Sequence, residues 1–153
     1  MSELKALVLG LGNRLRGDDG AGDEVMNLLE ERRIEGVEVR RLGGEAVDLM
    51  EAWEGKAKVI VVDAVRSGAP AGTLHRFQVD RDPVPLQLFG KSTHTFSVAE
   101  AIELARALGK LPSCLTLYGI EGTSFGIGEP VSPSVQSALP HLLEQIINDI
   151  QGG

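Results

Sequence analysis

The hydrophobic positions of the chain fall into alternating strand-like and helix-like segments. Continuous apolar runs at 6–9 and 59–62 predict strands that are buried on both faces, and a third apolar run at 113–120 predicts another strand. Val37–Leu42 alternates apolar and charged residues, which predicts a strand nearer a sheet edge. Residues 73–79 alternate weakly and predict an edge strand. An antiparallel orientation is open for it, because no crossover helix separates it from the preceding strand.

Helical stripes of apolar residues lie between most of these strands. Four helices are predicted: one from near Ala21, one over 46–53, one that begins at a capping box of Ser97 and Glu100, and one that begins at Pro133. This order of elements predicts a three-layer α/β/α sandwich with a mostly parallel, twisted sheet of about five strands. All 153 residues are expected to form a single domain.

Composition narrows the possible partners. The formal charge of −7 argues against general nucleic-acid binding, which needs a basic face. No apolar run approaches the length of a membrane span, and Glu3 and Lys5 interrupt what would be the apolar region of a signal peptide. The single cysteine, Cys114, excludes an internal disulfide and fits a reducing, cytoplasmic compartment.

The most distinctive stretch is GLGNRLRGDDG at 10–20, which is predicted to be the loop from the first strand to the first helix. Its first glycines resemble a dinucleotide-binding fingerprint, but Leu15 stands where that fingerprint needs a third glycine. Asp18 and Asp19 would repel a phosphate at the helix N-terminus and suit a metal or a proton better. Capping of the helix by one of them is an equally good interpretation at this point.

Two further residues are candidates for the same site. Asp63 directly follows the most hydrophobic predicted strand, and ligands of open α/β sheets bind beyond the carboxyl ends of strands. His94 lies in a loop before a helix, whereas His75 and His141 are interpreted as surface or packing histidines. Asp19, Asp63 and His94 together would supply two oxygen ligands and one nitrogen ligand. Such a set suits Zn or Ni with open coordination positions.

Three segments in the same order carry a resemblance to a known family. These are the loop at 10–20, VIVVDAV at 59–65 and KSTH at 91–94, and together they resemble the [NiFe]-hydrogenase maturation proteases. The resemblance implies a cytoplasmic endopeptidase that removes a short C-terminal extension from the hydrogenase large-subunit precursor after nickel insertion. The partner is then that precursor, with no nucleic acid or membrane involved, and a monomer is adequate for the task.

The resemblance also implies roles for individual residues. Asp19, Asp63 and His94 match the family's metal ligands, and Asp18 matches the acidic residue that precedes the first ligand. The nickel, or another divalent metal in its place, would be supplied by the precursor. It would serve for recognition and as a Lewis acid, while Asp18 or Asp19 accepts a proton. One departure is Leu42, where many members carry an aspartate.

Three other functions are compatible with the residues alone. A metal-dependent hydrolase of another substrate would hold its own zinc without any precursor. A nucleotide- or flavin-binding module would use the loop at 10–20, and nucleotides would then protect it against thermal unfolding. A non-catalytic chaperone would sense nickel loading through Asp19, Asp63 and His94 and leave the length of the precursor unchanged.

Overall fold

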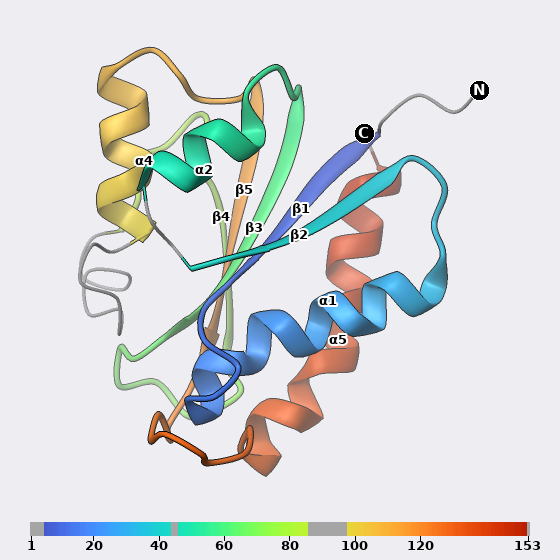
Figure 1. Cartoon of the computed structure of the whole chain (residues 1–153), viewed down its shortest axis with the longest axis vertical. Coiled ribbons are helices and arrows are strands. Elements are labelled where there is room, and N and C mark those ends of the chain that lie inside the picture. The colour runs from blue at the N-terminus through green and yellow to red at the C-terminus, as the bar shows by residue number, and fades with distance from the viewer. Residues whose placement is uncertain (1–4, 44–45, 86–97, 153) are drawn as a thin grey trace.

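The computed structural model describes residues 5–43, 46–85 and 98–152 (Figure 1). It is a mixed α/β structure with a five-stranded sheet in the order β2-β1-β3-β5-β4. The strands are β1 (Ala6–Leu11), β2 (Val37–Leu42), β3 (Lys58–Val65), β4 (Leu74–Gln78) and β5 (Cys114–Glu121). The first four strands in the spatial order run parallel, and β4 pairs with β5 in the antiparallel sense. The predicted fold class is therefore confirmed.

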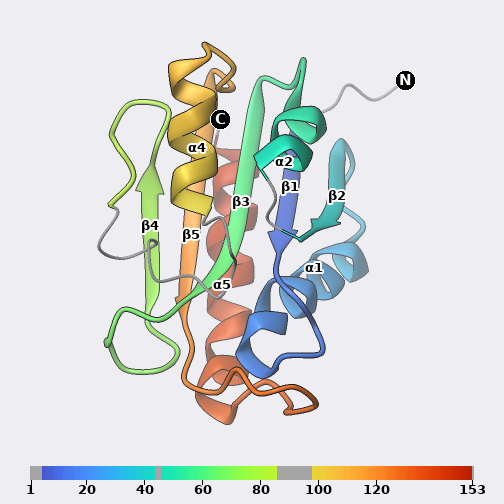
Figure 2. The same ribbon diagram turned by 60° about the vertical axis from the view of Figure 1, so that its left-hand side comes forward.

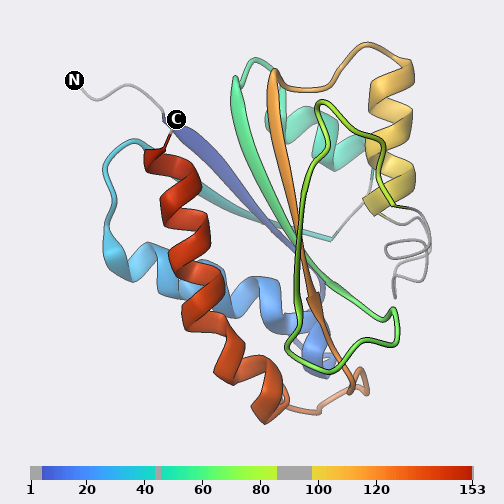
Figure 3. The same ribbon diagram turned by 180° about the vertical axis from the view of Figure 1, so that it is seen from behind.

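Helices cover both faces of this sheet, as the turned views show (Figures 2 and 3). On one face lie α1 (Ala21–Arg32) and α5 (Pro133–Gln151), and on the other lie α2 (Ala46–Trp53) and α4 (Val98–Ala107). Helix α5 runs through Pro140 as a single element. The predicted capping residue Ser97 lies outside the described residues.

Each face of the sheet has its own apolar core. On β3, Val59, Val61 and Val65 belong to the cluster beneath α2 and α4, and Ile60 and Val62 belong to the cluster beneath α1 and α5. This strict alternation is the pattern of a strand that is buried on both faces. Burial of each such side chain stabilises the fold by roughly 1.5–3 kcal/mol.

Two details differ from the predictions. Strand β3 was expected to end at Val62, but its ladder with β5 continues to the pair Val65 and Glu121, so Asp63 lies inside the strand. The antiparallel edge strand β4 pairs with β5, the later strand, and not with the strand that precedes it in sequence. In both cases the long-range pairing with β5 decides the outcome, and periodicity within a single segment does not contain that information.

Candidate active site

Asp63 is fully buried near the carboxyl end of the central strand β3. Its neighbours Val61 and Val65 both face α2 and α4, so the alternation of the strand places the Asp63 side chain on that face. Its register partner on β5 is Gly119, which carries no side chain. The sheet therefore brings a carboxylate to the edge where its parallel strands end, as the sequence predicts.

Asp19 lies at the same edge, in the short 3-10 helix η1 (Gly17–Gly20) that follows β1 and contacts β3. Its side chain is buried, and its Oδ2 accepts the backbone N–H of Asn13 at 2.8 Å. Gly12 makes this arrangement possible. It has a φ of +119°, and a Cβ at this position would lie 2.1 Å from the carbonyl oxygen of Asp19.

Asp18 is also buried, but its surroundings are those of an anchor. Oδ2 accepts the backbone N–H groups of Thr123 and Ser124 at 2.8 and 3.0 Å and the Ser132 hydroxyl at 3.0 Å, while Oδ1 accepts the Ser132 N–H at 2.7 Å. Burial by itself would raise the pKa of Asp18, but these donors together hold it below its ordinary value. The geometry favours a positioning role, and proton transfer by Asp18 stays a prediction.

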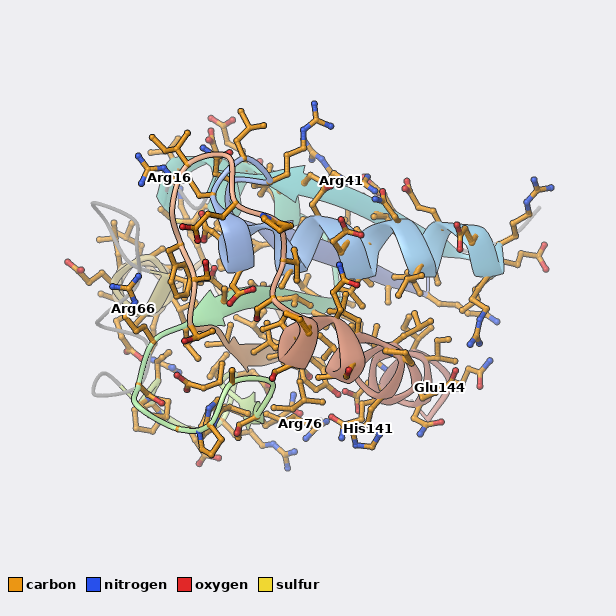
Figure 4. The ribbon with its side chains drawn as sticks, turned by 90° about the horizontal axis from the view of Figure 1, so that it is seen from below. Arg16, Arg41, Arg66, Arg76, His141 and Glu144 are labelled. Atoms are coloured by element: carbon orange, nitrogen blue, oxygen red, sulfur yellow. The ribbon has the colours of Figure 1, made fainter. Side chains whose placement is uncertain are left out.

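Asp18 joins two loops that we call the paired loops, residues 13–18 and 122–132. The glycine-rich segment after β5 could be a free rim or a long turn by sequence. In the structure it is bonded to the loop after β1 (Figure 4). Three backbone N–H groups also donate between the paired loops: Gly17 to Glu129 O (3.1 Å), Asp18 to Ser124 O (2.6 Å) and Gly128 to Leu15 O (2.7 Å).

A second group of polar side chains near Asp63 was not expected from the sequence. Glu121, buried at the end of β5, accepts the Ser67 N–H at 2.8 Å and the Ser67 hydroxyl at 2.5 Å, and its Oε1 lies 3.1 Å from His75 Nε2. His75 pairs with Gly119, as Asp63 does from the other side. This histidine, interpreted as a surface or packing residue, therefore lies on β4, two strands away from Asp63. The one sequence feature that could have indicated this group is Glu121, a glutamate at the end of a predicted buried strand.

The remaining predicted residues are placed only in part. His94 lies outside the described residues. Leu42 packs against the core beneath α2 and α4, at the carboxyl end of β2. Among the described ranges no group of three or more His, Cys, Asp or Glu side chains could hold a metal. The structure thus brings Asp18, Asp19 and Asp63 to one end of the sheet, and the metal site predicted from Asp19, Asp63 and His94 stays a prediction.

Comparison with known proteins decides the family. The family model described as hydrogenase maturation protease matches residues 24–149, most of the chain. The chain belongs to the hydrogenase maturation protease family. The match includes the positions of Asp63 and His94, whereas Asp18 and Asp19 precede it.

Individual relatives agree with this assignment. The chain is 30% identical to the hydrogenase expression/formation protein HupD of Thiocapsa roseopersicina, covering 94% of this chain and 70% of the relative. It is also 30% identical to the hydrogenase 2 maturation protease of Escherichia coli, covering 94% and 89%. Membership of this family makes the chain a peptidase of hydrogenase maturation.

Solved structures agree with the fold. The hydrogenase maturating endopeptidase HybD from E. coli superimposes with a TM-score of 0.79 at 25% identity, over 96% of this chain and 92% of that one. In the described part of the chain, no helix has the length and apolar character needed to span a membrane.

Proposed function

We propose that this protein is the endopeptidase that removes a C-terminal extension from the nickel-loaded large-subunit precursor of a [NiFe] hydrogenase. In this proposal Asp19, Asp63 and His94 bind the nickel that the precursor already carries. The observation that supports it most is the burial of Asp19 and Asp63 at one sheet edge, on η1 and β3, which contact each other.

The donor set fits this chemistry. Two carboxylate oxygens and one imidazole nitrogen suit a borderline divalent ion and leave positions open for ligands from the precursor. Nickel held in this way would polarise the carbonyl of the scissile bond or activate a water molecule. Asp18 would hold the paired loops beside Asp19. Because both oxygens of Asp18 accept hydrogen bonds, Asp19 is the carboxylate of this loop that would accept a proton.

The test is a processing assay with purified protein and the nickel-loaded precursor of the hydrogenase from the same organism. Mass spectrometry should show a shorter large subunit. Asp63→Asn and His94→Ala should each reduce the cleavage rate by more than about 100-fold while circular dichroism and thermal melting stay close to wild type. His141→Ala, which changes an exposed histidine on α5, is the matched control and should cleave normally.

The outcomes separate this proposal from the alternatives. Normal cleavage by His94→Ala would exclude nickel binding by that residue. Binding of the precursor with no change in its length would indicate a nickel-sensing chaperone. A full equivalent of metal in protein purified without any precursor would indicate a hydrolase with a resident ion, and elemental analysis of that sample measures it.

A further inference from the structure

The paired loops expose two large apolar side chains beside the candidate active site. Leu15 is 62% exposed and Ile127 is 76% exposed, the two highest values among large hydrophobic residues in the described ranges. Both positions are fixed, because the Gly128 N–H donates to the Leu15 carbonyl at 2.7 Å. Apolar side chains that are exposed together within a polar rim are typical of interaction sites.

The rim around these two side chains is basic, although the protein as a whole carries a charge of −7. Arg14 and Arg16 flank Leu15 and are exposed, and neither forms an ion pair within the part of the chain that the structure describes. Arg66 adds a third positive charge, with its guanidinium 4.3 Å from the ring of Phe125 on the second paired loop. Figure 4 shows Arg16 and Arg66 at the same end of the molecule.

One acidic side chain partly offsets this charge. Glu129 is exposed on the second paired loop, where its carboxylate accepts the Ser124 hydroxyl. Among the described residues of the paired loops, together with Arg66, the exposed charges are thus three arginines and one glutamate. A partner that approaches it meets an apolar pair in a region of net positive charge.

The apolar pair is connected to Asp19 through two short hydrogen bonds. The Leu15 N–H donates to Asn13 Oδ1 at 2.8 Å, and the Asn13 N–H donates to Asp19 Oδ2 at 2.8 Å. A chain segment that lies on Leu15 is therefore held close to the carboxylate that the proposed function uses.

We infer that Leu15 and Ile127, with Arg14, Arg16 and Arg66 around them, form the docking surface for the precursor. The matching segment of the precursor carries an apolar side chain flanked by acidic residues and lies close to the bond that is cut. The positive charge of the rim favours an acidic segment. The hydrogen bonds that link Leu15 through Asn13 to Asp19 favour a segment near the bond that is cut. This inference rests on the proposed function.

The test compares two double variants with matched controls in the processing assay. Leu15→Ser/Ile127→Ser should raise KM about ten-fold with kcat within about two-fold, because the lost contact is the same before and during the reaction. The control Val47→Ser/Leu108→Ser removes side chains of similar exposure, 61% and 55%, in α2 and directly after α4, the helices on the sheet face that α1 and α5 do not cover, and should leave KM unchanged.

A second comparison tests the charge of the rim. Arg14→Glu/Arg16→Glu should raise KM by more than about ten-fold, with an effect that shrinks as salt is added. Arg33→Glu/Arg81→Glu changes two exposed arginines at the opposite edge of the sheet, one after α1 and one after β4, and is the control. Thermal melting should show that all four double variants are folded.

Each outcome bears on one of the two claims. If wild-type protein cleaves the precursor and the Leu15/Ile127 variant has the wild-type KM, the docking surface is wrong and the proposed function stands. If wild-type protein neither binds nor cleaves the precursor, the proposed function fails and the inference fails with it. If wild-type protein forms a dimer that the Leu15/Ile127 variant dissociates, the surface joins two copies of this chain and the inference is overturned.

Discussion

Two aspartates far apart in the molecule are held in opposite ways, and the contrast separates the site from its scaffold. Asp18, at the carboxyl edge of the sheet, is fully buried and accepts three backbone N–H groups and one hydroxyl. Asp149, near the end of α5, accepts side-chain donors: Arg76 Nε and Nη2 at 3.1 and 2.8 Å, and the hydroxyl of Tyr118.

The difference lies in what each carboxylate fixes. Backbone donors set the path of a loop, so Asp18 determines the conformation of the paired loops next to Asp19. Side-chain donors set the packing of elements, so Asp149 fastens α5 to β4 and β5 through Arg76 and Tyr118. We conclude that a buried anion positions the loop beside the proposed chemistry, while a surface ion pair adds to the apolar packing of α5.

The largest effect is expected from Asp18→Ala. The change leaves three backbone N–H groups without their acceptor. Each donor that no water molecule reaches should cost about 1–3 kcal/mol of folding stability. We expect the free energy of unfolding to fall by about 3–5 kcal/mol, measured by urea denaturation. Asp48→Ala, at an exposed position in the first turn of α2, is the control and should cost less than about 1 kcal/mol.

Asp18→Asn keeps the comparison informative if the alanine variant does not fold. Its amide oxygen retains one acceptor but directs an NH2 group at the remaining donors, so an intermediate loss of stability is expected. A loss below about 1 kcal/mol for both Asp18 variants would show that water replaces the carboxylate at this position.

The stability that the cluster of Asp149, Arg76 and Tyr118 contributes should depend on pH in the alkaline range. Burial, together with the neighbouring Asp149, raises the pKa of Tyr118 above its ordinary value. A tyrosine with a raised pKa in the folded state contributes stability that is complete below the unfolded pKa of about 10 and is lost as the pH rises through the folded pKa. Stability should therefore fall above about pH 10.

The variant Tyr118→Phe isolates this contribution. Wild-type protein should be the more stable of the two at pH 8 and should lose stability more steeply between pH 10 and pH 11, by up to about 1.4 kcal/mol per pH unit. Thermal melts in matched buffers measure both curves. Parallel curves over this range would mean that the Tyr118 hydroxyl ionises in the folded protein as readily as in the unfolded chain.

The sequence predicts the scaffold better than it predicts the roles of the acids. The run of β-branched residues at 59–62 is sufficient to identify the central strand, because burial on both faces requires such residues at successive positions. The end of that strand and the partner of β4 depend on β5, about 50 residues later in the chain.

The roles of Asp18 and Asp19 are beyond the reach of the sequence for a related reason. The two residues are chemically identical neighbours, and the donors that make Asp18 an anchor lie 105 to 114 positions away. His75 was likewise judged from its own segment, whereas its partner Glu121 is 46 positions away. The proposal that Asp19, Asp63 and His94 bind a metal follows from the family resemblance, and both their role and their joint geometry stay a prediction.

The smallest effect is expected from Arg76→Lys, which tests whether the Asp149 cluster depends on the shape of the guanidinium or only on its charge. Lysine keeps the charge but loses the two parallel bonds to the carboxylate. Because Arg76 is 44% exposed, solvent weakens the pair, and we expect a loss of about 0.5–1 kcal/mol that shrinks in high salt. Urea denaturation at low and high salt measures it. A loss as large as that of Asp18→Ala would remove the contrast, because the surface pair would then stabilise the fold as strongly as the buried anchor.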